Sequence, residues 1–211
     1  MSADSELARL LEHPAIWRGR SAARTEVVPT GFDALDDRLP GRGWPRTGLI
    51  EILVSRFGVG ELYLLLPALA ILTRRPAARW CAWIAPPAGL EPFAPALVGH
   101  GVALERALVV RAPAMAMWAF EQSLGSGACD VAMAWARRPH VREIRRLQLA
   151  AERGRALGIL FRSQRAARES SPAVLRMALE PSARGACATL LKSRGGARGS
   201  VEIAWLPVAG S

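Results

Sequence analysis

Short apolar segments alternate with longer segments of mixed polarity through the first three quarters of the chain. The apolar segments are nearly continuous, which is typical of strands covered on both faces, and lie at residues 49–54, 80–85, 107–111, 129–134 and 157–161. Helical patterns lie between them, at residues 61–74, 91–99, 113–124 and 141–155. The alternation predicts an α/β fold whose central sheet is mainly parallel, with helices on both faces.

The C-terminal end has a different pattern. Three consecutive segments read as strands with no helix between them, at residues 174–179, 186–191 and 200–205. A glycine-rich stretch at 193–199 is typical of a hairpin loop. We therefore expect antiparallel strands at this end of the sheet.

The N-terminal segment is expected to form an arm outside the core. Residues 4–18 read as an amphipathic helix, and Leu10, Leu11 and Trp17 are its candidate contacts with a partner or with the core. The predicted organisation is an arm at 1–24, a core domain at 25–206 and a tail at 207–211.

Composition excludes several classes of protein. Half of the residues are apolar, and no apolar run approaches the roughly 18 residues of a membrane-spanning helix. The acidic N-terminus is unlike a signal peptide, so a cytoplasmic location with no membrane contact is expected. The three cysteines, Cys81, Cys129 and Cys187, lack the spacing of a metal or redox site and are expected to be free thiols. No metal or cofactor is predicted.

Charge is distributed unevenly along the chain. Residues 137–198 carry 15 basic and 4 acidic residues, whereas the remainder carries 13 basic and 14 acidic residues. Such asymmetry favours an anionic partner, and single-stranded DNA is the candidate. A merely solvated basic face remains the alternative.

The segment from Gly48 to Leu62 reads as a buried strand, a glycine-bearing turn and the start of an apolar helix. A phosphate-binding loop has this arrangement, and Gly58 and Gly60 suit its turn. The lysine that such a loop needs is absent, and Glu61 places a negative charge where the anion would sit. Pro67 is expected to kink the following helix.

The residues around this loop resemble those of RecA-type recombinases. The resemblance lies in Thr30-Gly31 and Leu35-Asp36, a turn with glycine and proline at 41–45, and the strand Gly48-Leu49-Ile50-Glu51-Ile52. It implies a RecA-like core over residues 25–206. At the positions of that family's catalytic glutamate and magnesium-binding aspartate the chain has Pro87 and Trp135. Neither side chain can do the original chemistry, so a degenerate nucleotide site without ATP hydrolysis is expected.

The resemblance also implies candidate contacts with DNA or a partner. Gln164 matches the family's DNA-sensing glutamine, and Lys192 and Arg194 match a basic pair that reaches the neighbouring subunit. Further candidates are basic residues near that glutamine or on one face of the predicted helix 141–155: Arg162, Arg165, Arg168, Arg142, Arg145 and Arg146. Trp80, Trp83, Trp118, Trp135 and Trp205 are expected in the core, and Trp44 is a candidate partner contact.

Within the RecA superfamily the chain is most similar to ImuA-type proteins, the accessory factors of bacterial SOS mutagenesis. The similarity lies in residues 10–20, in residues 58–69 and in the absence of a recombinase C-terminal domain. It implies a non-enzymatic role in translesion DNA synthesis, with an ImuB-type pseudo-polymerase and a DnaE-type error-prone polymerase as partners and RecA as a further candidate. The alternatives are a cell-division inhibitor of the SulA type and a divergent ATPase.

Overall fold

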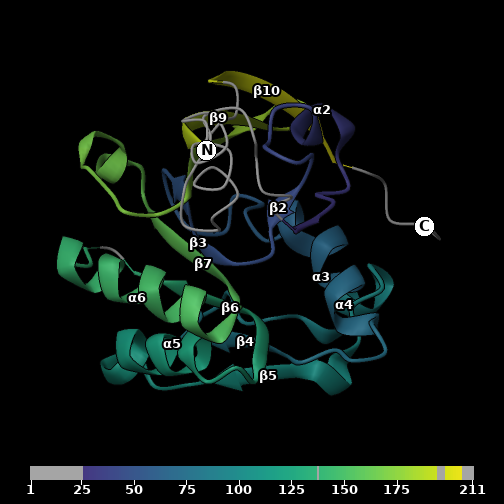
Figure 1. Ribbon diagram of the computed structural model, residues 1–211. Helices are drawn as coiled ribbons and strands as arrows, with labels where there is room; N and C mark the ends of the chain where they lie inside the picture. Colours follow the sequence, from purple (N-terminus) through teal and green to yellow (C-terminus); the bar gives the residue numbers. More distant parts are fainter. Residues whose placement is uncertain (1–25, 137, 194–197, 206–211) are drawn as a thin grey trace, which may run out of the picture.

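The computed structural model describes residues 26–136, 138–193 and 198–205, and it has the predicted α/β architecture (Figure 1). The helices and strands in chain order are β1 (Val27–Val28), α2 (Asp33–Asp36), β2 (Trp44–Pro45), β3 (Gly48–Val54), η1 (Tyr63–Leu65), α3 (Leu66–Arg74), β4 (Trp80–Ile84), α4 (Ala94–Gly99), η2 (Leu104–Arg106), β5 (Ala107–Val110), η3 (Pro113–Met115), α5 (Ala116–Gly125), β6 (Cys129–Trp135), α6 (Val141–Gly154), β7 (Leu157–Ser163), η4 (Gln164–Arg168), β8 (Leu175–Ser182), β9 (Gly185–Ser193) and β10 (Gly199–Ala204).

Eight strands form the main sheet, in the order β10-β9-β8-β3-β7-β6-β4-β5. Neighbours from β8 to β5 pair in parallel, whereas β8, β9 and β10 pair antiparallel to one another. Every residue of β3 and of β6 is buried, as expected of central strands covered on both faces. The prediction of a mainly parallel sheet with antiparallel strands at its C-terminal end is therefore confirmed.

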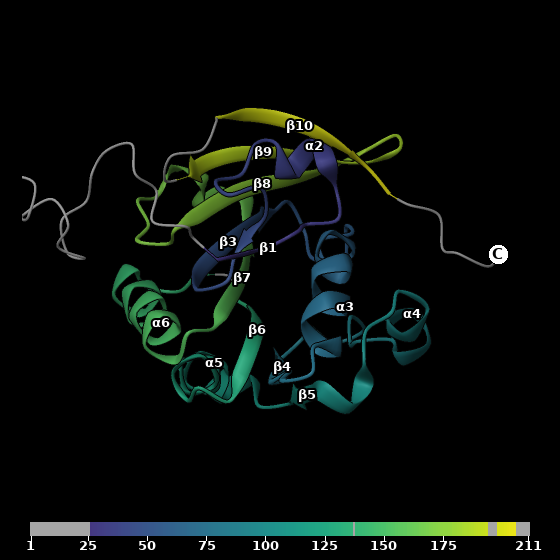
Figure 2. The same ribbon diagram turned by 45° about the vertical axis from the view of Figure 1, so that its right-hand side comes forward.

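Helices cover the two faces of the sheet in pairs (Figure 2). Side chains of α3 and α4 pack with Ile50, Ile52 and Val54, on one face of β3. Side chains of α5 and α6 belong to a second apolar cluster with Leu49, on the opposite face. The chain runs outward along the sheet from β3 to β5 and then returns through β6 and β7. Right-handed crossovers place the outward and returning helices on opposite faces.

The start of α3 differs from the prediction. The helix was expected to begin at Glu61 with Pro67 inside it, but it begins at Leu66 after a single 3₁₀ turn. Pro67 therefore lies in the first helical turn, where a backbone N–H has no intrahelical partner, and the expected kink is wrong. A Cβ on Gly31 would lie 2.4 Å from Cβ of Pro67, so these two residues pack face to face.

Three tryptophans lie where the sequence pattern did not place them. Trp44 was expected on the surface, but it belongs to β2, pairs with β1 and is fully buried. Trp80 and Trp118 were expected in the core, but 42% and 55% of their surfaces are exposed. Trp80 begins a strand and Trp118 lies on the outer side of α5. The periodicity of the sequence therefore did not predict whether these side chains are buried or exposed.

Several expectations fall outside the described residues. The arm with Leu10, Leu11 and Trp17, and also Arg194, belong to segments that the structure does not describe. In the described ranges, no helix has the length and apolar character needed to cross a membrane.

Candidate functional site

The turn after β3 is closed by a side chain of its own. The carboxylate of Glu61 accepts hydrogen bonds from the backbone N–H groups of Gly58, at 2.8 Å, and Val59, at 2.9 Å. Gly58 and Gly60 have φ angles of 85° and 98°, which a side chain rarely tolerates, so the turn depends on glycine at both positions. Glu61 is only 2% exposed. A carboxylate thus occupies the N–H groups that would receive a phosphate in a working loop.

Apolar groups fill the space around the same turn. A Cβ on Gly60 would lie 3.0 Å from the indole of Trp205, and one on Gly58 would lie 2.9 Å from Leu90. Trp205 also contacts Tyr63, with ring centroids 4.9 Å apart, and Phe32, at 6.0 Å. The turn is therefore covered by side chains that come from distant parts of the chain.

The two other degenerate positions also hold structural roles. Trp135 ends β6 with only 8% of its surface exposed, and its ring stacks on Phe161 at 4.9 Å between centroids. Pro87 lies in the loop after β4, where its carbonyl accepts a hydrogen bond from the N–H of Leu90 at 2.9 Å. No group of three or more metal-ligating side chains occurs in the described ranges.

A buried ion network joins β3, β7 and β8. Glu51 of β3 is fully buried and contacts Arg162 of β7 at 2.7 Å and Arg176 of β8 at 2.5 Å. Arg162 also pairs with Glu169 at 2.7 Å, and Arg176 donates to the carbonyls of Glu169 and Ala166. The network holds η4 against the sheet. Arg162 was a candidate DNA contact, but its side chain is 1% exposed, so that expectation is wrong.

The other candidates around η4 lie at the surface. Arg165 and Arg168 are exposed and line a shallow hollow with Gln164. The Gln164 amide donates to Glu180, and Lys192 Nζ donates to the carbonyl of Ser171 at 2.7 Å. The structure therefore brings Gln164, Arg165 and Arg168 together and anchors Lys192 to a neighbouring loop.

The predicted basic face of α6 is present. Arg142, Arg145 and Arg146 are exposed, whereas Ile144 and Leu147 on the opposite side are buried. Arg146 pairs with Glu121 of α5 at 2.5 Å. The side chains of Arg142 and Arg145 make no hydrogen bond or ion pair with the described residues.

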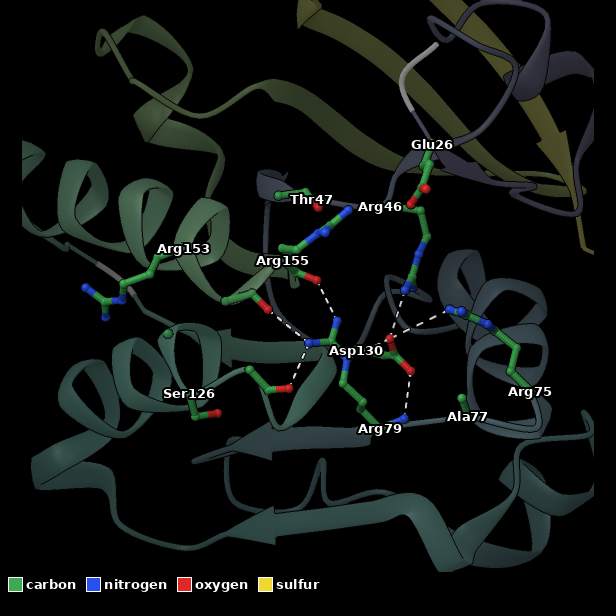
Figure 3. Close-up of a pocket in the computed structure, with 13 residues that line it drawn as sticks. Glu26, Arg46, Thr47, Arg75, Ala77, Arg79, Ser126, Asp130, Arg153 and Arg155 are labelled. Carbon is green, nitrogen blue, oxygen red and sulfur yellow. Dashed lines mark hydrogen bonds and ion pairs between the residues drawn. The ribbon is translucent and has the colours of Figure 1, made fainter. Parts of the chain in front are cut away.

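A separate pocket of about 480 Å³ lies at the opposite edge of the sheet, where the parallel strands begin (Figure 3). Asp130 of β6 is at its centre, with 3% of its surface exposed. Its carboxylate accepts hydrogen bonds from the guanidinium groups of Arg46, at 2.8 Å, and Arg79, at 3.1 Å. The guanidinium group of Arg75 lies 3.7 Å from the same carboxylate. Two further arginines, Arg153 and Arg155, also line the pocket.

Arg79 joins several elements at this edge. Its guanidinium donates to the carbonyls of Gly127 and Gly154 at 2.9 Å and of Arg155 at 2.5 Å, which follow α5 and end α6. Burial alone would raise the pKa of Asp130, but hydrogen bonds from Arg46 and Arg79 outweigh it and hold that pKa below its ordinary value. Asp130 is therefore ionised at neutral pH.

Sequence reasoning missed this pocket. Its residues come from the segments that precede β3, β4, β6 and β7, and the contacts of Asp130 span 51 and 84 positions of sequence. A usable signal was present, because a charged residue stands within two positions of the first residue of each of these apolar strands. In a parallel sheet such positions meet at one edge.

Cys81 and Cys129 are buried and Cys187 is half-buried, and all three are free thiols. Burial, the largest cause, raises the pKa of Cys81 and of Cys129. They are poor nucleophiles for that reason.

A solved structure of a known protein is similar to about half of this chain. No model of a protein family matches the chain, and no curated protein matches it. Among solved structures, SulA from Pseudomonas aeruginosa is similar, with 29% identity over 54% of this chain and 97% of that chain. The TM-score of that similarity is 0.45.

Proposed function

We propose that this chain is a non-enzymatic, RecA-like accessory factor of the DNA-damage response that acts in translesion DNA synthesis through protein contacts. The observation that supports the non-enzymatic part of the proposal is the bidentate contact of Glu61 with the N–H groups of Gly58 and Val59. It leaves the strand-to-helix turn in place and removes its capacity for a phosphate. The part in translesion DNA synthesis rests on the sequence resemblance to ImuA-type proteins.

Nucleotide binding at this turn would require two changes. The carboxylate of Glu61 would have to leave its two N–H donors, and a triphosphate would otherwise meet its negative charge at close range. The indole of Trp205 would also have to leave Gly60. The chain offers no lysine near the turn to offset these costs, since its single lysine is Lys192.

Exposed apolar side chains around the edge strand β5 support a role in protein contacts. Phe93 precedes α4, Leu108 lies on β5, and Met115 and Trp118 lie in η3 and α5. Their exposed fractions are 68%, 43%, 51% and 55%. Exposed tryptophans are frequent anchors of protein–protein interfaces, so Trp118 is the candidate contact.

The first experiment measures nucleotide binding by calorimetry. We expect no heat of binding from ATP with magnesium at concentrations where working phosphate loops are saturated. Micromolar, magnesium-dependent binding would contradict the proposal and favour the divergent ATPase.

The second experiment measures capture of purified partners: an ImuB-type pseudo-polymerase, a DnaE-type polymerase and RecA. We expect capture of at least one of them, weakened by Trp118→Ala. The matched control is Leu149→Ala, an exposed apolar residue of α6 with 54% of its surface accessible. The SulA-type alternative predicts inhibition of the cell-division protein FtsZ. Failure to capture any of the three partners, combined with inhibition of FtsZ polymerisation, would favour that alternative.

A further inference from the structure

The pocket at the amino edge of the sheet, where the parallel strands begin, has more positive charge than its own carboxylates neutralise. Five arginines line it (Arg46, Arg75, Arg79, Arg153 and Arg155), against two acidic residues, Glu26 and Asp130. Glu26 makes no ion pair within the described ranges, and Asp130 is shared by Arg46, Arg79 and Arg75. Three positive charges are therefore in excess.

The donors of these arginines are used unequally. Arg79 is fully engaged with Asp130 and with three carbonyl groups. Arg75 reaches Asp130 only at 3.7 Å, beyond the range of a hydrogen bond. The side chains of Arg153 and Arg155 have no hydrogen bond or ion pair with the described residues. Nη1 of Arg46 is buried and has no partner there either.

The guanidinium groups approach the pocket from different elements. Figure 3 shows Arg46 and Arg75 extending towards Asp130 from two sides, and Arg153 directed away from it. Arg155 follows α6 at a φ angle of 49°, a left-handed conformation that ends the helix and fixes where its side chain begins. Arg46, Arg75 and Arg155 thus surround one open space from three parts of the chain.

We propose that this pocket binds a phosphate group, through Arg75 and Arg155 with Arg46 as a further donor. Guanidinium groups match the geometry of phosphate oxygens and remain charged at every physiological pH. The cavity of about 480 Å³ is within the size range of small-ligand sites. Asp130 holds Arg46 and Arg79 in place, whereas Arg75 and Arg155 keep donors for a ligand. The inference is independent of the closed turn at the opposite edge.

The phosphate could belong to a small molecule or to the backbone of single-stranded DNA, and the test separates the two sources. Inorganic pyrophosphate is titrated by calorimetry and a labelled oligonucleotide by fluorescence anisotropy, both at low ionic strength. Binding of pyrophosphate assigns a small-molecule ligand, whereas binding of the oligonucleotide alone assigns the nucleic-acid backbone. Absence of binding by both probes overturns the proposal.

The variant Arg75→Gln/Arg155→Gln should lower the affinity for the bound probe about a hundredfold, because each of the two lost contacts is a charge-assisted hydrogen bond. The matched control Arg142→Gln/Arg145→Gln removes the same charge from exposed positions of α6, and should lower the affinity less than about threefold. Equal losses in the two variants would mean general electrostatic attraction and would overturn the site.

A measurement on the unaltered chain keeps the test valid if the variant folds poorly. Pyrophosphate or the oligonucleotide, whichever binds, should protect Arg75 and Arg155 from phenylglyoxal and leave Arg142 reactive, as read by peptide mass. Unchanged modification of Arg75 and Arg155 in the presence of a bound probe places that probe elsewhere, and the proposal is then wrong.

Discussion

The two ends of the parallel strands differ in what neutralises the groups that could bind an anion. At the carboxyl edge, where the strands end, the turn after β3 binds the carboxylate of Glu61 and is covered by Trp205 and Leu90. At the amino edge, arginines outnumber acidic groups around an open pocket. Ligands of open α/β sheets usually bind at the carboxyl edge. Here the turn after β3 at that edge is occupied by Glu61, Trp205 and Leu90, and the pocket that we propose for a phosphate lies at the other end of the strands.

The largest expected effect concerns the buried ion network of Glu51, Arg162 and Arg176. Glu51→Gln should reduce the free energy of unfolding by about 3–5 kcal/mol, because two buried arginines lose their shared carboxylate. Urea denaturation measures the change. The control is Glu169→Gln in the same network, where half of the side chain is exposed and the loss should stay below about 1 kcal/mol. Similar losses for the two variants would show that burial does not set the strength of this network.

The next effect concerns Asp130 at the amino edge. Asp130→Asn should cost about 2 kcal/mol at neutral pH, since it leaves Arg46 and Arg79 without a carboxylate. Because the folded-state pKa of Asp130 lies below the unfolded value of about 3.9, the carboxylate stabilises the fold fully above that value. Its contribution is lost as the pH falls through the folded-state pKa.

The difference in unfolding free energy between the wild type and Asp130→Asn should therefore be constant near neutral pH and shrink below about pH 4. Urea denaturation across a pH series measures it. Asp37→Asn breaks an exposed pair with Arg42 and should cost much less at every pH. A difference that persists unchanged in strong acid would mean that Asp130 acts by shape and not by charge.

A smaller effect tests whether Glu61 stands in the place of an anion. Glu61→Ala should lower the free energy of unfolding by about 1–1.5 kcal/mol, because the N–H groups of Gly58 and Val59 lose their acceptor. Added phosphate should then raise the melting temperature of the variant more than that of the wild type, measured against sodium chloride at equal ionic strength.

Phosphate bound at the amino edge would stabilise the wild type and Glu61→Ala equally, so the difference between them isolates the turn. Glu105→Ala, at an exposed position of η2, serves as the control and should show no extra response to phosphate. An equal response from all three proteins would mean that the turn does not accept an anion even when it is vacated.

Much of the fold could be predicted from the sequence because its strands are nearly continuous in apolar residues. The runs that became β3 and β6 have no other stable place than a sheet covered on both faces. The ribbon of β1 and β2 could not be predicted, since two-residue strands have no periodicity. Pro67 was misread because the apolar run 61–74 was interpreted as one helix, although a proline is a local signal of a first helical turn.

In the candidate site, too, contacts between neighbouring residues could be predicted from the sequence, and contacts between distant residues could not. Glu61 could be singled out because its contacts lie two and three residues away. The partners of Glu51, Arg162 and Arg176, lie 111 and 125 positions further on, and only the order of the strands brings them together. Arg162 was therefore predicted to lie at the surface, because nothing local in the sequence distinguishes a buried arginine from a solvated one.

The smallest expected effect concerns two arginines in the basic C-terminal third of the chain, and it compares the contributions of the two edges to DNA affinity. If single-stranded DNA binds, Arg165→Gln/Arg168→Gln on η4 should weaken it about twofold to threefold and lower the salt dependence by about one counterion per lost contact. Anisotropy titrations over a salt series measure both quantities. The loss should be smaller than for Arg75→Gln/Arg155→Gln, because Arg165 and Arg168 border only a shallow hollow. A larger loss at η4 would reverse the comparison and make the carboxyl edge the main nucleic-acid contact.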